Sequence, residues 1–311
     1  MTTLNEVFSN LSASRRYEVW FLRLGLEDGA AWWFRYLLTN PGRGGCKGDV
    51  ASLPVQVWAT WFPVGEKPQT FIQQFPLSGL ELSGRKESPF HFRIGENAIE
   101  ENFCRGSFDV DGHTIRWNLH YQSTFRVTLS SKGWIGFSRT PHSDAIVSGE
   151  IEFDGKRFAG EPLATGLQGH NCGYRHRKLW RWAHVYFAGR DGPPSTFEAL
   201  VYEMPLGLLF RKAVLWHDGK AHVFRQVEER VDREQMRWRL GGIGSDGLQL
   251  EATIDGSGIG VQRLPYTKTD CSGSFEVANN SLASARVILR RGDGSTEELE
   301  TGTGAVLEFV G

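Results

Sequence analysis

The residues best suited to chemistry lie in two neighbouring stretches near the middle of the chain. Residues 169–173 read Gly-His-Asn-Cys-Gly and combine an imidazole, an amide and a thiol in one short segment. Residues 179–188 predict a strand, and because side chains alternate along a strand, one face carries Trp180, Trp182, His184 and Tyr186. An aromatic wall with one imidazole suits a pocket for a large apolar molecule that has a few polar groups. It is equally typical of an aromatic β-core in which His184 is simply hydrogen-bonded.

Addition of water to an alkene, or ring closure on one, begins with delivery of a proton to carbon. Such a site needs a protonated acid, aromatic faces that stabilise a cation, and dryness apart from the reacting water. Glu203 is a candidate acid because burial favours the protonated form of a carboxyl, with Glu198 as an alternative and Tyr202 to orient it. His184 and His170 are further candidate acids. The plain alternative for Glu203 is an exposed carboxylate at a strand end.

Two arginines, Arg23 and Arg35, lie inside predicted aromatic strands, which is unusual for a pure core. They either bind a polar head group of a ligand or form structural ion pairs with Glu18 and Glu198, and the ion pairs are the more ordinary interpretation. The histidines lack the spacing of a metal site, so we expect no metal. No nucleophile elbow, Walker loop or dinucleotide fingerprint is present, so we expect neither hydrolase nor nucleotide chemistry and no cofactor.

Length and composition describe a globular protein without a strong charge bias. The 311 residues suffice for one large or two ordinary domains. Lys and Arg total 35 against 36 Asp and Glu, which argues against nucleic-acid binding. The four cysteines lie far apart without a Cys-x-x-Cys pair and predict reduced thiols. No signal peptide or membrane-spanning run is visible, so we predict a cytoplasmic protein with no integral membrane segment, which leaves transient membrane contact open.

Frequent glycines and short aromatic runs between turn residues predict an all-β protein. A weak internal repeat relates residues 17–36 to residues 180–202, since each has an aromatic strand, an Asp-Gly turn and a second aromatic strand. Each hairpin can open a barrel of about eight strands, which predicts two domains, 1–165 and 166–311. One large sandwich would need an unusual number of strands in one core. The polar residues 66–75 predict a short helix or lid-like loop.

The chain resembles the two-domain lipocalin-like (calycin) family that includes carotenoid hydratases of the hydroxyneurosporene synthase type. Tocopherol cyclases and lipocalin-like Diels–Alderases are more distant members. The matching segments are residues 18–21, 32–36, 57–60 and 169–173, and the Trp180-x-Trp182 pair. Relatives commonly carry a tryptophan where this chain has Cys172, which leaves the shape of that corner open. The resemblance implies two antiparallel β-barrels packed together around an apolar cavity for an isoprenoid or polyketide-like molecule.

We therefore expect a cofactor-free hydratase or cyclase that acts on an apolar isoprenoid or polyene substrate at the domain junction, by proton transfer to carbon. The alternative is a non-catalytic carrier of a hydrophobic small molecule, which would use the same cavity without an acid. In both cases the expected partner is that hydrophobic molecule. The predicted binding residues are Asn171, Trp180, Trp182 and Tyr186 from the second half and Trp20, Trp32, Phe34, Arg35 and Trp58 from the first.

Overall fold

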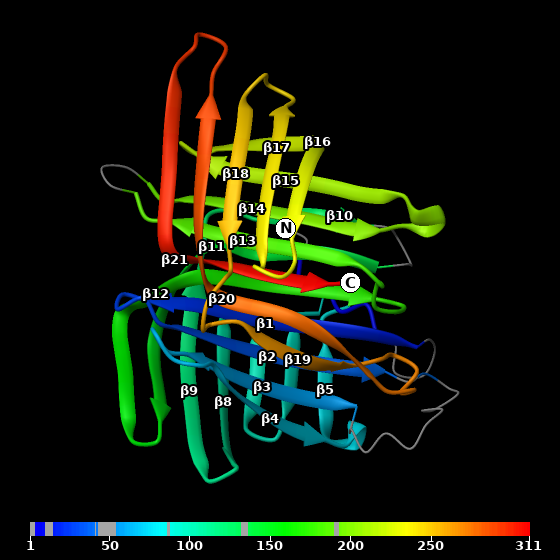
Figure 1. The fold of residues 1–311 in the computed structure, drawn as a ribbon. Helices are drawn as coiled ribbons and strands as arrows, with labels where there is room; N and C mark the ends of the chain where they lie inside the picture. Colours follow the sequence, from blue (N-terminus) through cyan, green and yellow to red (C-terminus); the bar gives the residue numbers. More distant parts are fainter. Residues whose placement is uncertain are drawn as a thin grey trace.

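The computed structural model describes residues 4–9, 15–40, 42, 54–85, 88–131, 136–189 and 193–311. Two antiparallel sheets contain nearly all of the regular structure (Figure 1). Short 3-10 turns at Leu77–Gly79 and Pro205–Gly207 are the helical elements of these residues. The all-β prediction is therefore confirmed.

The first sheet contains β1 (Arg16–Leu26), β2 (Ala31–Asn40), β3 (Val55–Phe62), β4 (Gln69–Phe75), β5 (Leu80–Ser83), β6 (His91–Ile94), β7 (Asn97–Glu100), β8 (Phe103–Val110), β9 (His113–Gln122), β10 (Val127–Ser131), β11 (Gly136–Phe153) and β12 (Lys156–Gly173). Its order is β4-β3-β2-β1-β12-β11-β9-β8-β7-β6-β5, with β10 paired to β11. The edge strands β4 and β5 do not pair with each other, so this sheet is a curled half-barrel.

The second sheet contains β13 (Trp180–Phe187), β14 (Ser195–Glu203), β15 (Leu209–His217), β16 (Lys220–Asp232), β17 (Arg237–Gly244), β18 (Gln249–Asp255), β19 (Gln262–Thr267), β20 (Ser274–Arg290) and β21 (Thr296–Val310). Neighbouring strands pair in the order β18-β17-β16-β15-β14-β13-β21-β20-β19. A further pairing of β18 with β20 closes an eight-stranded barrel and leaves β19 outside the ring.

The chain passes from the first sheet to the second between Gly173 and Trp180. Strand β12 runs without a break through residue 165, so the predicted domain boundary falls inside a strand, and residues 174–179 connect the two sheets. The two hairpins of the internal repeat, β1–β2 and β13–β14, face each other across the junction. Phe21 and Trp33 contact Trp182 there, with ring centroids 5.8 and 6.2 Å from the indole.

Side-chain alternation divides the buried residues into three layers. One fills the inside of the half-barrel and includes Trp20, Trp32 and Phe34, all fully buried. A second fills the closed barrel around Trp238. The third lies between the outer faces of the two sheets and includes Phe21, Trp33, Phe62, Trp182, Leu200 and Tyr202. Side chains fill both barrel interiors, and an apolar cavity lies in the third layer.

The cysteines differ from the prediction. Cys104 and Cys172 are free and buried, but Cys271 is disulfide-bonded, so the prediction of reduced thiols is wrong for Cys271. Cys46 lies outside the described residues. The cysteines therefore no longer support a reducing, cytoplasmic location. Within the described ranges, no helix has the length and apolar character needed to cross a membrane.

Candidate active site

A cavity of about 140 Å³ lies in the layer between the two sheets. This is close to the ~150 Å³ of a protein cavity that admits benzene, so the cavity holds a ring or a short chain and not an entire long polyene. Most of its wall is aromatic or aliphatic, with a few polar groups. The lining residues are Tyr17, Val19, Phe21, Trp33, Arg35, Leu37, Trp58, Ser130, Gly136, Phe137, Ser138, Asn171, Cys172, Gly173, Arg175, His176, Arg177, Trp180, Trp182, Leu200, Tyr202, Tyr266 and Glu308.

Six residues that the sequence pointed to lie on this wall, namely Arg35, Trp58, Asn171, Trp180, Trp182 and Tyr202. Tyr186 lies further along β13 and does not line the cavity. Trp20, Trp32 and Phe34 do not line it either, because their side chains point into the half-barrel. Their neighbours Phe21 and Trp33 take the expected place, since a shift of one residue along a strand reverses the face.

The Gly-His-Asn-Cys-Gly segment is explained by its pairing with β1. The register sets Gly173 opposite Tyr17 and Gly169 opposite Phe21. A Cβ atom would lie 2.1 Å from the Phe21 ring if added to Gly169, and 2.7 Å from the Tyr17 ring if added to Gly173. The two glycines therefore make room for two rings of the cavity wall. Asn171 lies between them, and its Oδ1 is buried without a hydrogen bond to the described part of the protein.

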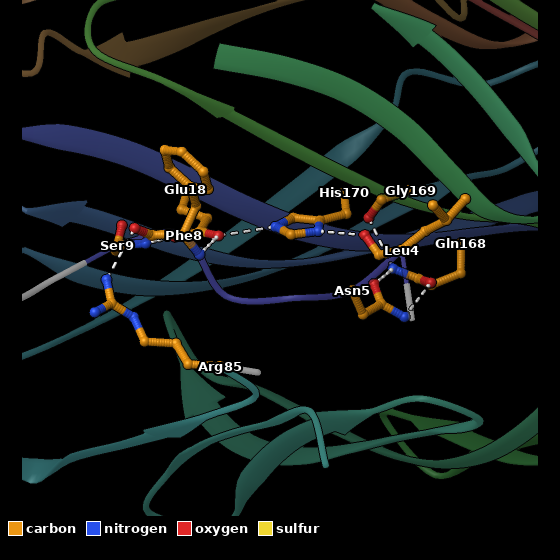
Figure 2. A network of polar contacts seen from close by, with 9 residues as sticks. All are labelled: Leu4, Asn5, Phe8, Ser9, Glu18, Arg85, Gln168, Gly169 and His170. Carbon is orange, nitrogen blue, oxygen red and sulfur yellow. Dashed lines mark hydrogen bonds and ion pairs between the residues drawn. The ribbon is translucent and has the colours of Figure 1, made fainter. Parts of the chain in front are cut away.

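His170 does not line the cavity but fastens the N-terminal segment to the half-barrel (Figure 2). Its Nδ1 donates to the carbonyl oxygen of Leu4 at 2.9 Å, and its Nε2 is 3.0 Å from Oε1 of Glu18. The Glu18 carboxylate also accepts the backbone N–H groups of Phe8 and Ser9. All of these contacts are structural, so the geometry does not support His170 as an acid for a substrate in the cavity.

His184 and Glu203, two further candidate acids, are also absent from the cavity wall. His184 is fully buried and donates from Nε2 to the carbonyl oxygen of Ser143 at 2.7 Å. Burial lowers the pKa of His184 to about 3, so its imidazole is neutral at physiological pH. Glu203 is half-buried at the end of β14, where its backbone N–H bonds the carbonyl oxygen of Leu179.

Glu308 is the carboxyl group that the sequence analysis missed. It lies on β21 directly opposite Trp182, is 9% exposed, and lines the cavity. Its Oε1 accepts the indole N–H of Trp180 at 2.8 Å, and its Oε2 accepts the hydroxyl of Tyr266 at 3.3 Å. Burial raises the pKa of Glu308, although Arg35 and the two hydrogen bonds oppose this. The available signal was one glutamate inside the apolar run 305–310.

Arg35 forms the cationic corner of the cavity next to Glu308. Its Nη2 lies 3.5 Å from Oε2 of Glu308, and its Nη1 donates to the hydroxyl of Tyr266. The guanidinium carbon is 3.8 Å from the centroid of the Trp33 ring and 5.4 Å from that of Trp58. These aromatic faces stabilise a cation that is 5% exposed.

The predicted ion pairs of the two arginines with Glu18 and Glu198 are wrong. Arg35 pairs with Glu308, while Arg23 donates to the carbonyl oxygens of Ser281 and Thr303. The reason is the alternation of faces. Glu18 shares the inward face of β1 with Trp20, whereas both arginines point outward.

Glu198 supports the cavity wall from behind. Its Oε1 accepts the indole N–H of Trp182 at 2.9 Å and the hydroxyl of Thr140 at 2.7 Å. Burial raises the pKa of Glu198 to about 7. It does not line the cavity. Glu198 therefore positions Trp182 and is not placed to touch a ligand.

One group among the described residues has the arrangement of possible metal ligands, and it is remote from the cavity. His217, Asp218 and Glu297 meet at the turn between β15 and β16, with their ligand atoms within 4.8 Å of one another. None of the three lines the cavity. Arg291 already pairs with Glu297 at 2.7 Å, which disfavours a cation there.

No protein-family model matches the chain, and no curated protein matches its sequence. Several solved structures, however, are similar to the chain in fold. CghA with Sch210972 has a TM-score of 0.62 at 13% identity, over 95% of this chain and 88% of that one. The chain has the two-barrel lipocalin-like fold. Kievitone hydratase from Nectria haematococca has a TM-score of 0.59 at 10% identity, over 100% of this chain and 95% of that one. A putative AttH from Nitrosomonas europaea has a TM-score of 0.52 at 12% identity, over 94% of this chain and 92% of that one.

At such identities these similarities establish the fold and not the reaction. The resemblance to carotenoid hydratases in particular stays a prediction.

Proposed function

We propose that the protein is a cofactor-free hydratase or cyclase that transfers a proton to a carbon–carbon double bond of an apolar substrate. The observation that carries this proposal is Glu308, a carboxyl on an aromatic cavity wall whose pKa is raised by burial. The shared fold with a hydratase, kievitone hydratase, adds support. The isoprenoid character of the substrate is the finer part of the proposal, and the apolar cavity wall is compatible with it.

In this mechanism the protonated carboxyl of Glu308 donates its proton to the alkene, and the neighbouring carbon becomes a cation. The faces of Trp180 and Trp182 stabilise that cation. The carboxylate left behind is stabilised by Arg35 and by the hydroxyl of Tyr266. In hydration, water adds to the cation and its surplus proton returns to Glu308. In cyclisation, a second alkene closes on the cation, and loss of a proton to Glu308 restores the acid.

The test is incorporation of deuterium from deuterated water into candidate alkenes, with Glu308→Gln as the variant. We expect carbon-bound deuterium with the wild type and a rate at least ~100-fold lower in the variant, the usual scale of a general acid. Binding of the alkene should change little. Glu203→Gln is the matched control, since Glu203 does not line the cavity and should keep the wild-type rate. Full incorporation by Glu308→Gln would remove the acid from the mechanism.

The carrier alternative is favoured by one observation. Glu308 and Arg35 form an ion pair, so each charge has a partner and the carboxyl needs no catalytic role to explain its burial. A carrier would bind apolar molecules, detected as a change in tryptophan emission that Trp182→Ala abolishes, but would incorporate no deuterium. Tight binding without incorporation across a panel of prenylated and polyene compounds would decide for this alternative.

A further inference from the structure

The loop between β14 and β15 displays apolar side chains that the proposed reaction does not need. Leu206 is 96% exposed and Leu208 is 60% exposed. The backbone N–H of Met204 bonds the carbonyl oxygen of Leu208 at 2.7 Å and closes the loop. Leu206 has a φ of 67°, a left-handed conformation that is costly for a side chain of this kind. The loop therefore holds a leucine outward at its tip.

This loop lies beside the segment that rims the cavity. The backbone N–H of Glu203 bonds the carbonyl oxygen of Leu179 at 3.0 Å, which joins residues 204–208 to residues 174–179. In the second segment, Arg175 and Arg177 line the cavity, and Arg175 is exposed. The exposed leucines therefore neighbour a segment whose Arg175 is both exposed and part of the cavity wall.

The rim segment is strongly basic in a chain whose net charge is only −1. Arg175, Arg177 and Lys178 follow the exposed Tyr174, and residues 174–179 contain no carboxylate. Two acidic residues lie nearby, Glu203 at the end of β14 and Glu308 on the cavity wall. Aromatic, aliphatic and cationic side chains in one place are the combination that proteins use at the surface of an anionic bilayer.

We propose that this face docks on an anionic lipid surface. Leu206 and Leu208 enter the headgroup region, and the exposed Arg175 and Lys178 contact lipid phosphates. The cavity then opens toward the lipid, which is where an apolar molecule resides. The docking surface stands on its own exposure and charge; only the use of lipid as the source of substrate rests on the proposed function.

A protein partner is the competing occupant, and the geometry favours lipid. A specific protein interface needs roughly 800 Å² of complementary surface on each side. Here the apolar groups are single side chains at the tips of two loops. Protruding side chains of this kind fit a fluid layer better than a preformed pocket.

The experiment is sedimentation of the full chain with vesicles of phosphatidylcholine alone or mixed with phosphatidylserine. We expect binding to the mixed vesicles, weakened by salt. The double variant Leu206→Ser, Leu208→Ser should lower the partition coefficient by about tenfold or more, and Lys178→Glu should lower it for mixed vesicles only. Binding that is absent in the wild type, or equal for both vesicle types, would overturn the proposal.

Ile243→Ser is the matched control. Ile243 is 62% exposed but lies at the other end of the closed barrel, near Asp246, which pairs with Lys220 and His222. It should keep wild-type binding. If Ile243→Ser lost vesicle binding as the leucine variants do, the assignment of docking to the face with Leu206 and Leu208 would be wrong. Deuterium incorporation into a detergent-dispersed substrate should be unchanged in the leucine variants, so failure of docking and failure of the reaction are read separately.

Discussion

Glu308 and Glu198 are both buried carboxyl groups with raised pKa values, yet their surroundings prepare them for different tasks. Glu308 faces the cavity and has Arg35 beside it, so its ionised form is stabilised after proton transfer. Glu198 accepts hydrogen bonds from two neutral groups, Thr140 and Trp182, and has no counter-ion within an ion-pair distance in the described chain. The first arrangement suits a proton donor, and the second suits a fixed support.

The Glu198 carboxyl should make stability depend on pH. Its pKa is about 7 in the folded protein against an ordinary 4.5, so the native state prefers the neutral form. Stability from this group is fully present below pH 4.5 and is lost as pH rises through about 7, by roughly 3 kcal/mol. We expect Glu198→Gln, which keeps an acceptor for Trp182, to remove that loss. Urea unfolding at about pH 5 and pH 8 measures it.

A variant that retains the full decline in unfolding free energy between the two pH values would contradict this assignment. Glu203→Gln is again a suitable comparison, since it removes a carboxyl from the end of the same strand. Its pH dependence should follow that of the wild type.

At the scale of elements, the pairing of β12 with β1 builds one wall of the cavity. Gly169→Ala places a methyl group against the ring of Phe21, where only 2.1 Å is available. We expect the ring to be displaced, with a loss of about 1–3 kcal/mol in unfolding free energy and weaker quenching of tryptophan emission by apolar probes. Denaturant titration and fluorescence titration test the two effects.

Gly241→Ala is the control for that change, because Gly241 also lies in a strand but the nearest atom to its added Cβ is 3.9 Å away. It should affect stability and probe binding much less. Equal effects of the two substitutions would show that the close approach to Phe21 is not the cause.

The sequence revealed which face of β13 lines the cavity, but it did not reveal this for β1 and β2. On β13 the bulky residues Trp180 and Trp182 share one face, and the structure places that face on the cavity. Every residue of β2 is buried and both of its faces carry a tryptophan, Trp32 or Trp33, so the sequence does not reveal which face is inside the half-barrel. The prediction of a short helix or lid-like loop at residues 66–75 is wrong, because these residues are mostly polar and show no strand-like alternation of apolar side chains. Residues 69–75 of this stretch form the strand β4, where Thr70 bonds Gln262 of β19.

The polar corner of the cavity was beyond prediction from local pattern. Arg35, Tyr266 and Glu308 come from three strands in two sheets, and no spacing in the sequence relates them. The family resemblance supplied the fold and the location of the cavity at the junction. It did not supply the acid, because the residues it emphasised, such as His170, serve the attachment of the N-terminal segment.

At the scale of the whole molecule, the shared apolar layer couples the two sheets. Trp182 lies in this layer and contacts Phe21 and Trp33 of the first sheet. We expect the wild type to unfold in one transition, with far-ultraviolet circular dichroism and tryptophan emission giving the same midpoint. Trp182→Ala should lower the free energy of unfolding by about 3–5 kcal/mol and give different midpoints for circular dichroism and tryptophan emission.

Trp238→Ala serves as the comparison, because Trp238 is equally large but packs only inside the closed barrel. It should destabilise the protein without the loss of coupling that Trp182→Ala produces. Two independent transitions in the wild type would contradict the prediction.

Arg35 has a further consequence during synthesis on the ribosome. The first sheet can pair completely once β12 has emerged, long before the chain reaches Glu308. At that stage the outer face that carries Trp33 and Trp58 is uncovered and prone to association with other chains. Trp33, the ring that the guanidinium covers in the complete protein, belongs to the same strand, β2. We expect a charge in the middle of this nascent apolar face to act as a gatekeeper that keeps the half-made protein soluble until its own second barrel covers it.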